Sequence, residues 1–235
     1  MQRRVVTEWL DELDPLDPRA VRSRQNLQRV NKLMGNLRTV AMVLEVHAPP
    51  HLERIVELGG GDGTFLLRLA RRMASRWPRV RVTLVDRLDL VAESTRSQIR
   101  QLGWELETVQ AEAGDWLAAD HGKGLVIANL FLHHFALEQL SWLLRRAAQS
   151  AEAFVACEPR RSLISLTASA GLGLLGCNAV TRHDAVVSVR AGFAGKELSA
   201  LWPCDGGWVT SEGSAGLFSH CFTAVRTGPH PRKGT

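Results

Sequence analysis

An alternation of short apolar segments with amphipathic ones constrains this chain more than any other feature, and it runs from residue 54 to residue 159. The apolar segments are nearly continuous, which is typical of strands that are buried on both faces of a parallel sheet. Segments with apolar residues at three- and four-residue steps separate them, as expected for helices. This order predicts an α/β fold in which helices cover both faces of the sheet. The expected strands are 54–60, 81–86, 105–110, 124–130 and 153–159.

The segments before and after this alternation complete the expected domain. Residues 1–48 repeat apolar residues at helical spacing, so we expect a helical cap that serves the substrate site or a dimer contact. Two segments within 208–226 predict a β-hairpin added to the sheet. The expected parts are a cap over 1–50, a main domain over 51–226 with a substrate-side insertion at 160–191, and a flexible basic tail over 227–235.

The composition is that of an ordinary globular protein. Of the 235 residues, 45% are hydrophobic and 23% are charged, which excludes a disordered or fibrous chain. The net charge of +5 suggests a nucleic-acid partner, but part of the excess comes from Arg226, Arg232 and Lys233 near the end of the chain. The charge is therefore a weak argument for nucleic-acid binding.

The cysteines and the apolar segments bear on the location of the protein. Cys157, Cys177, Cys204 and Cys221 lack the spacing of a zinc site or a disulfide framework, so we expect no metal site and a reducing environment. The first residues hold only a two-residue apolar step before Thr7, which is too short for a signal peptide. No apolar run reaches the ~20 residues that span a bilayer. We expect a soluble cytoplasmic protein.

A glycine-rich loop follows the first expected strand. Its pattern is E-x-G-x-G-x-G, formed by Glu57, Gly59, Gly61 and Gly63. A P-loop would end in Gly-Lys-Ser/Thr, and this loop has no lysine there. A dinucleotide-binding loop would have a third glycine where Thr64 stands, so that pattern is incomplete.

This loop resembles the first motif of the class I S-adenosyl-L-methionine-dependent methyltransferases, and later segments resemble further motifs of that family in the same order. Asp86 ends the second expected strand, Asp115 and Trp116 follow the third, and Asn129 ends the fourth. The resemblance covers residues 54–226. It implies a Rossmann-like three-layer sandwich with a mixed seven-stranded sheet, and S-adenosylmethionine as cofactor.

The resemblance also implies roles for individual residues. Gly59 and Gly61 would line the methionine part of the cofactor, and Glu57 would order the loop near its amino group. Asp86 would accept hydrogen bonds from the ribose hydroxyls. The full set of expected cofactor-binding residues is Glu57, Gly59, Gly61, Gly63, Asp86, Asp115, Trp116 and Asn129.

These assignments leave simpler interpretations open. The glycines also suit a tight strand-to-helix turn without a ligand. Asp86 also suits a turn at the end of a strand. Asp115 would accept a hydrogen bond from the adenine amine and Trp116 would lie against the ring, but a single Trp after an Asp is also a common core residue.

Three histidines are the expected catalytic residues. Methylation of a hydroxyl oxygen requires removal of its proton, and a positioned histidine is the usual base. His133 and His134 follow the fourth expected strand, at the edge where open parallel sheets bind ligands. His183 precedes Asp184 in the substrate-side insertion. Packing against the next helix, or a surface turn, is the alternative role for each of them.

The acceptor is expected to be a small hydrophobic or aromatic molecule, methylated on a hydroxyl oxygen or on a ring carbon. The strings LFLHHF and SHCFTAVR resemble the quinone and polyketide branch of the family, which implies secondary metabolism. The Asn-Pro-Pro-Tyr and Pro-Cys signatures of nucleic-acid methyltransferases do not follow the fourth strand. The alternatives are a non-catalytic regulatory or assembly subunit and an RNA methyltransferase. A homodimer is a further possibility that the apolar helices allow.

Overall fold

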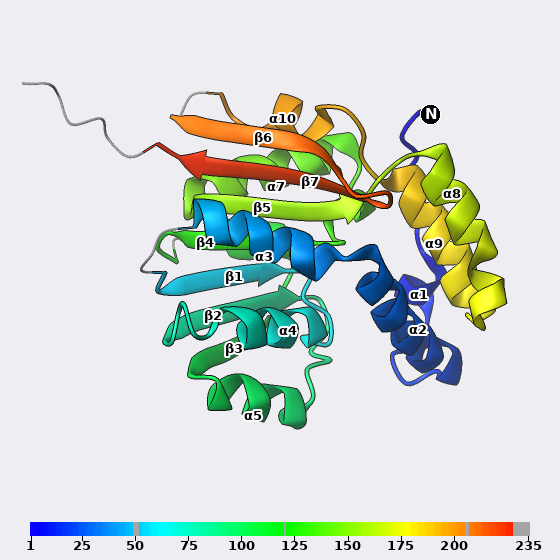
Figure 1. Ribbon diagram of the computed structural model, residues 1–235, viewed down its shortest axis with the longest axis horizontal. Coiled ribbons are helices and arrows are strands. Elements are labelled where there is room, and N and C mark those ends of the chain that lie inside the picture. The colour runs from blue at the N-terminus through cyan, green and yellow to red at the C-terminus, as the bar shows by residue number, and fades with distance from the viewer. Residues whose placement is uncertain (49–51, 120, 205–206, 228–235) are drawn as a thin grey trace, which may run out of the picture.

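A seven-stranded sheet forms the centre of the computed structural model, which describes residues 1–48, 52–119, 121–204 and 207–227 (Figure 1). The strands are β1 (Arg54–Leu58), β2 (Val80–Asp86), β3 (Trp104–Gln110), β4 (Gly124–Asn129), β5 (Ala151–Pro159), β6 (Trp208–Ala215) and β7 (Ser219–Arg226). Their order in the sheet is β3-β2-β1-β4-β5-β7-β6. The first five strands are parallel, and β7 is antiparallel to both of its neighbours. The predicted mixed seven-stranded sheet is confirmed.

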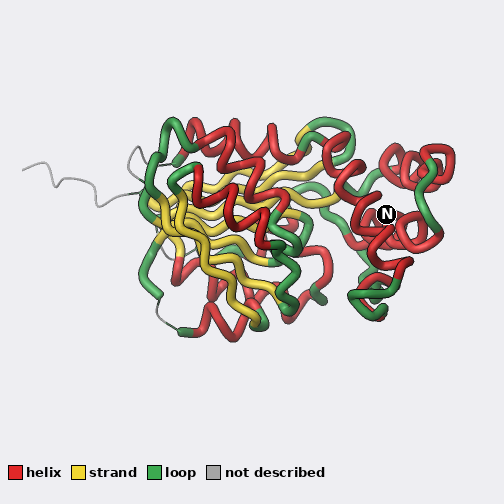
Figure 2. The backbone as a smooth tube through the Cα atoms, turned by 90° about the horizontal axis from the view of Figure 1, so that it is seen from below, coloured by secondary structure: helices red, strands yellow, loops and turns green. Residues whose placement is uncertain are grey.

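Helices cover both faces of this sheet, as Figure 2 shows. One layer holds α3 (Asn36–His47), α4 (Thr64–Met73) and α5 (Glu93–Gln101), and the other holds α6 (Ala113–Ala118), α7 (Leu137–Ser150) and α10 (Glu197–Leu201). Alternation along the strands explains the two layers, because successive side chains of a strand point to opposite faces. Ile55 packs in the core with α3 and α4, whereas its neighbour Val56 packs in the core with α6 and α7. The predicted three-layer sandwich is confirmed.

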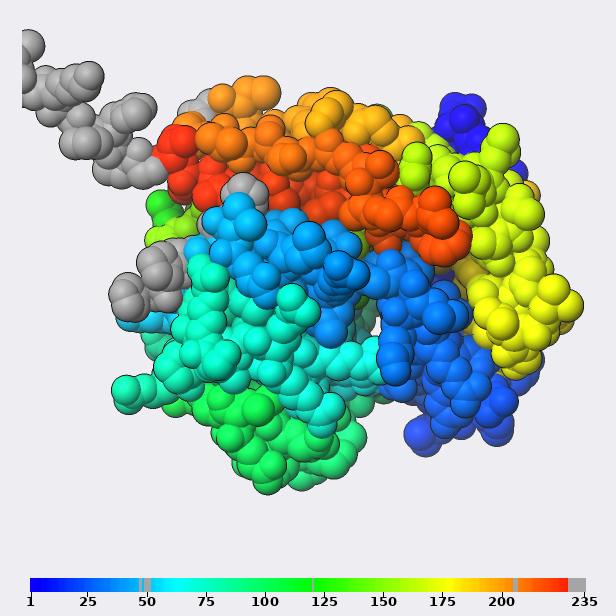
Figure 3. All heavy atoms as spheres, viewed as in Figure 1, coloured from blue at the N-terminus to red at the C-terminus, as the bar shows by residue number. Residues whose placement is uncertain are grey.

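A separate lobe lies beside the carboxyl ends of the parallel strands (Figure 1). It consists of α1 (Trp9–Glu12), α2 (Pro18–Met34), α8 (Leu163–Ala170), the 3-10 helix η2 (Gly171–Leu175) and α9 (Ala179–Ala191). Helix α9 contacts α1, α2 and α8, so segments far apart in the sequence share one lobe. In Figure 3 the blue first helices and the yellow segment around residue 175 both lie in this lobe. The expected cap and the expected insertion are therefore neighbours.

Strands β1 and β4 are neighbours in the middle of the sheet. The direction in which successive strands are added to the sheet reverses between them. In open α/β sheets the crevice at such a reversal, outside the carboxyl ends of the strands, is where ligands bind. The glycine loop follows β1 and the loop with His133 and His134 follows β4. Both loops therefore face the lobe formed by α1, α2, α8 and α9.

The structure differs from the helical pattern that residues 1–48 predict. Residues 1–8 are extended rather than helical, and helix α1 has only four residues. The extended segment is held by long-range contacts: the backbone N–H of Arg4 donates to the carbonyl of Arg190, and Arg3 Nε donates to the carbonyl of Ala191. Contacts with α9 outweigh local propensity in this segment.

The structure also sets the bounds of two segments outside the parallel part of the sheet. Residues 183–190, which carry no clear periodicity, lie in helix α9, and the side chain of Asn178 caps this helix by accepting from Thr181 N–H. The hairpin turn begins at Gly216 because β6 continues through Gly213 to Ala215. The last eight residues of the expected basic tail lie outside the described residues. Within the described ranges, no helix is both long enough and apolar enough to cross a membrane.

Substitution of Phe154 tests the packing of the core between the sheet and helices α6, α7 and α10. Its ring is fully buried in β5, with the rings of Trp202 and Phe222 at centroid distances of 5.0 Å and 6.0 Å. Phe154→Ala should lower the free energy of unfolding by about 3–5 kcal/mol, because it leaves a cavity among packed rings. Urea denaturation measures this loss. Leu174→Ala, at a side chain that is 94% exposed, is the control and should change stability by less than about 0.5 kcal/mol. Equal losses in the two variants would contradict the packing.

Candidate cofactor and acceptor site

The glycine loop makes a tight turn from β1 into α4. Gly59, Gly61 and Gly63 have φ angles of 68°, 54° and 72°, a region that residues with a Cβ rarely adopt. A Cβ on Gly59 would lie 2.1 Å from Cδ2 of Phe131, so the ring of Phe131 needs a glycine beneath it. The predicted turn is therefore built by the backbone, and it brings the loop after β4 against the loop after β1.

Two aspartates hold this loop. Asp86, at the end of β2, accepts from the backbone N–H of Gly61 at 2.9 Å through Oδ2 and from that of Leu88 at 3.0 Å through Oδ1. Asp62 accepts from Thr64 N–H at 2.9 Å, at the start of α4. The other oxygen of Asp62 accepts from Gln28 Nε2 at 2.6 Å, which joins the loop to α2 of the lobe.

Glu57 is the most unusual group in the site. It is 2% exposed, and its Oε2 has no hydrogen-bond partner among the described residues. Burial, and then the nearby charges of Asp62 and Asp86, raise the pKa of Glu57 to about 8. A buried acceptor without a donor is costly, and a cation placed beside these carboxylates would stabilise all three.

A chain of hydrogen bonds orients Asn129 at the end of β4. Ser219 Oγ donates to Asn36 Oδ1 at 2.6 Å, and Asn36 Nδ2 donates to Asn129 Oδ1 at 3.2 Å. The amide oxygen of Asn129 therefore faces Asn36, which leaves its Nδ2 as a donor for other groups. Sequence reasoning missed Asn36, because its partners are 93 and 183 residues away along the chain. The next residue, Leu130, is the one non-glycine in the described ranges with a positive φ, 55°.

Asp115 and Trp116 both lie in α6, the helix that follows β3. Asp115 is exposed in the first turn of α6. The ring of Trp116 stacks on that of His121 at 4.0 Å, and the guanidinium of Arg54 lies 5.8 Å from its centroid. Arg54 begins β1 and His121 precedes β4, so Trp116 lies near the amino ends of the strands. The structure does not bring Trp116 together with the glycine loop.

The first acidic residue after β3 in the chain is Glu112, which sequence reasoning did not consider. It is the N-cap residue of α6 and lies 3.1 Å from Nε of Arg87, the residue after Asp86. The available signal was its place two residues after the strand. The residues that the structure does bring together at one edge are Glu57, Gly59, Gly61, Gly63, Asp86 and Asn129.

His133 is enclosed between two carboxylates. Its Nδ1 lies 2.8 Å from Glu158 Oε2, its Nε2 lies 3.5 Å from Glu8 Oε1, and its side chain is 4% exposed. Burial favours the neutral ring, but the hydrogen bonds and charges of Glu158 and Glu8 outweigh burial and raise the pKa of His133 to about 9. Without a bound metal ion, this raised pKa favours the protonated ring at neutral pH, which makes His133 a poor base.

His134 and His183 keep partly exposed rings, with side chains 31% and 32% exposed. His134 Nδ1 lies 3.5 Å from Asp11 Oδ2. His183 Nδ1 lies 2.8 Å from Asp184 Oδ1, and its ring stacks on Trp9 at 3.8 Å. The N-terminal segment thus contacts all three predicted histidines.

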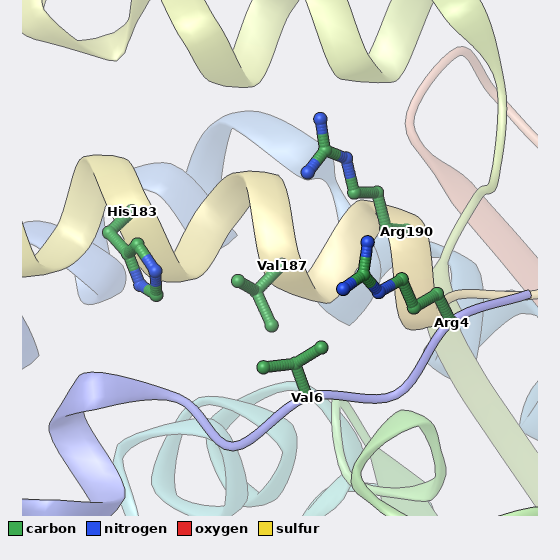
Figure 4. A pocket seen from close by; sticks show the side chains of 5 residues that line it. All are labelled: Arg4, Val6, His183, Val187 and Arg190. Carbon is green, nitrogen blue, oxygen red and sulfur yellow. The ribbon is translucent and has the colours of Figure 1, made fainter.

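A groove adjoins His183 on the outer side of this contact. Figure 4 shows His183, Val187 and Arg190 along α9, with Arg4 and Val6 of the extended segment opposite them.

Among the residues that sequence reasoning missed, Glu8 and Glu158 are the most consequential. Glu158 stands next to last in β5, and an acidic residue that ends the apolar run 153–157 is the available signal.

Comparison with known proteins agrees with the fold. Residues 55–152 match the family model described as a methyltransferase domain. No curated protein sequence matches this chain significantly.

Several solved structures share the fold at low sequence identity. An O-methyltransferase family protein from Burkholderia thailandensis is 18% identical with a TM-score of 0.59, covering 91% of this chain and 62% of its own length. The plantazolicin methyltransferase BpumL, crystallised with SAH, is 11% identical with a TM-score of 0.63, covering 90% of this chain and 92% of its own. The pyocyanin biosynthetic protein PhzM is 16% identical with a TM-score of 0.58, covering 94% and 62%. This chain therefore spans about three fifths of two of these proteins.

The sheet order and the glycine loop define a Rossmann-like methyltransferase fold. The match of residues 55–152 to a methyltransferase domain agrees with this fold.

Glu57→Gln tests the electrostatics of the loop. Above pH 4.5 the unfolded state ionises this carboxyl, whereas the folded state keeps its proton up to about pH 8, so the wild type loses stability across this interval. The variant lacks this loss. Its Tm should equal that of the wild type near pH 4.5 and exceed it increasingly towards pH 8, by about 2–4 °C for each kcal/mol. Differential scanning fluorimetry measures the difference.

The matched control is Glu105→Gln, at an exposed position of β3. Its Tm difference from the wild type should stay constant with pH. A Tm difference for Glu57→Gln that does not grow with pH would show that Glu57 ionises normally in the folded protein.

Proposed function

We propose that this chain binds S-adenosylmethionine at the carboxyl ends of β1, β2 and β4 and transfers its methyl group to a small hydrophobic or aromatic acceptor. The observation that carries the proposal is the buried, unpartnered Oε2 of Glu57 beside Asp62 and Asp86. S-adenosylmethionine carries an ammonium and a sulfonium, the positive charges that this group of carboxylates lacks. When bound, the cofactor supplies a methyl group on sulfur that a nucleophile displaces in line.

The residues at this edge fit such a cofactor. The glycines after β1 allow close approach of the backbone, because no Cβ stands in the way. Asp86 accepts one backbone N–H on each oxygen, and each carboxylate oxygen has a further lone pair for a ribose hydroxyl. Asn129 offers its Nδ2 as a donor. For the adenine end we propose the segment from Glu112 to Asp115, since Trp116 stacks elsewhere.

The lobe formed by α1, α2, α8 and α9 supports a small acceptor. It lies beside the carboxyl edge and is joined to the glycine loop by Gln28 and to the loop after β4 by Arg3 and Glu8. Such a cover suits a molecule that fits between the sheet and the lobe. Similar structures include a pyocyanin biosynthetic protein and a plantazolicin methyltransferase, which supports an acceptor from secondary metabolism.

For the acceptor atom we propose a hydroxyl oxygen, with His134 or His183 as the base. Both rings are partly exposed, and each has a carboxylate at Nδ1, Asp11 and Asp184 respectively, which orients the ring. The other ring nitrogen then faces away from the carboxylate and is the one to take the proton. His133 already carries a proton and serves to fix the loop.

Asp86→Ala tests the cofactor site. Calorimetric titration with S-adenosylhomocysteine should detect binding to the wild type and a loss of about 1–3 kcal/mol in the variant, the usual cost of removing hydrogen bonds to a buried polar group. Asp14→Ala, at an exposed residue before α2, is the control and should bind as the wild type does. If the wild type shows no heat of binding at millimolar ligand, the proposal is wrong. Unchanged affinity in Asp86→Ala would remove Asp86 from the site.

The base is tested with His134→Gln and His183→Gln. A panel of phenols, hydroxyquinones and pyrones, screened by mass spectrometry, identifies an acceptor and the atom that is methylated. With a hydroxyl acceptor and a histidine base, the rate should rise with pH and then level off. Loss of the base should lower kcat by ~10²–10⁴ without weakening cofactor binding. If both variants keep the wild-type kcat and pH profile, a histidine base is excluded and methylation of a ring carbon becomes the better proposal.

A further inference from the structure

A cluster of three potential metal ligands lies where the N-terminal segment meets the loop after β4. Glu8, His133 and His134 each offer one ligand atom, and these atoms lie within 4.8 Å of one another. Glu8 is 7% exposed and His133 is 4% exposed, whereas His134 faces partly outward. Two imidazole nitrogens and one carboxylate oxygen form a donor set that binds first-row divalent metals such as Zn²⁺.

A second, independent observation supports a metal site: carboxylates outside the cluster contact its two histidines. A histidine that binds a metal through one ring nitrogen usually has a carboxylate or carbonyl on the other. His133 has Glu158 Oε2 at 2.8 Å from Nδ1, so its Nε2 faces Glu8. Glu158 is fully buried and is itself fixed by the backbone N–H groups of Phe131 at 3.0 Å and Leu132 at 2.8 Å.

The second histidine has the same kind of support. Asp11 Oδ2 lies 3.5 Å from Nδ1 of His134. Glu8 is likewise held, because Ser188 Oγ donates a hydrogen bond to its Oε1. All three potential ligands are therefore oriented by groups outside the cluster before any ion arrives.

The distances and charges favour a cation in this place. The 3.5 Å between His133 Nε2 and Glu8 Oε1 is long for a hydrogen bond but is close to the separation of two ligands around one Zn²⁺ ion, whose bonds are about 2.0–2.2 Å. Glu8, Asp11 and Glu158 bring three carboxylates to two histidines. With neutral imidazoles, a divalent ion would balance two of these three charges.

We propose that Glu8, His133 and His134 form a binding site for a divalent transition-metal ion such as Zn²⁺, with Glu158 and Asp11 as supporting groups. The ion ties the extended N-terminal segment to the loop after β4. Three protein ligands leave at least one coordination position for water or another ligand. The proposal rests on side-chain geometry. With the ion bound, His134 is a ligand and His183 is the remaining candidate base.

The test is metal binding by the full chain, prepared without a polyhistidine tag and stripped with chelator. Titration with Zn²⁺, followed by calorimetry, should show one ion per chain. Titration with Co²⁺ should give the visible absorption of an ion with nitrogen ligands. Zn²⁺ should also raise the Tm, since it joins two segments that are separate in the unfolded chain.

Variants locate the ion. Glu8→Gln and His134→Gln should each weaken Zn²⁺ binding by more than ~10-fold, and Glu158→Gln by ~10–100-fold, as removal of supporting groups does elsewhere. His183→Gln is the matched control, because His183 has the same exposure and also pairs with a carboxylate, yet lies outside the cluster. It should bind Zn²⁺ as the wild type does.

Two outcomes would overturn the proposal. If the wild type binds no more Zn²⁺ or Co²⁺ than a chain with both Glu8→Gln and His134→Gln, the cluster is an ion pair in which a proton on His133 supplies the positive charge. If binding is present but His183→Gln weakens it as much as the cluster variants do, the ion lies elsewhere. Glu8→Gln and His134→Gln change atoms at the edge of the lobe, and circular dichroism of each variant shows that it is folded.

Discussion

The buried carboxylate of Glu158 makes the interactions on which the loop after β4 depends. It stands in β5, and its two oxygens accept from Phe131 N–H, Leu132 N–H and His133 Nδ1. These bonds shape the loop after β4, in which Leu130 takes a positive φ and Phe131 packs over Gly59. The orientation of His133 then offers Nε2 to Glu8, so that one carboxylate fixes both the loop and the segment that covers it.

Groups of carboxyl side chains with at least one buried member occur twice along the same edge of the sheet. At the first position Glu57, Asp62 and Asp86 lie at the glycine loop. Burial and the two aspartates raise the pKa of Glu57 to about 8, so its carboxyl keeps its proton at neutral pH when no cation is bound. At the second, Glu8 and Glu158 flank His133. Each group is costly to bury unless a positive charge accompanies it. The proposed cationic cofactor would supply the positive charge beside Glu57. A proton on His133 or the proposed metal ion would supply it between Glu8 and Glu158.

The cover of the site is assembled from two distant parts of the chain. The first eight residues and helices α1 and α2 pack with α9, and Asp184 accepts from the backbone N–H of Trp9 at 2.9 Å and of Leu10 at 3.0 Å. Arg3 donates to the carbonyls of Leu132, His133 and Phe135. The loop after β4 is therefore held by residues 1–8, and substitutions in those residues would affect the loop directly.

Sequence by itself determined the order and type of the elements, because these follow from local patterns. Buried strands give continuous apolar runs, and the glycines of 59–63 allow a turn that other residues would resist. It also placed Glu57, Asp86 and Asn129 at one edge, since the carboxyl ends of parallel strands share an edge. The extended residues 1–8 were missed because contacts with α9 override their local pattern.

Tertiary structure alone decided which side chains meet. Trp116 follows β3 in sequence, yet the turns of α6 carry its ring to His121 and Arg54 near the strand starts. Asn36, Asn129 and Ser219, like Glu8, His133 and Glu158, come from three separate segments, and no local pattern links them. Local periodicity reports which face of an element is buried, whereas the partners of a buried polar group depend on how distant elements pack, and that is known only from the folded chain.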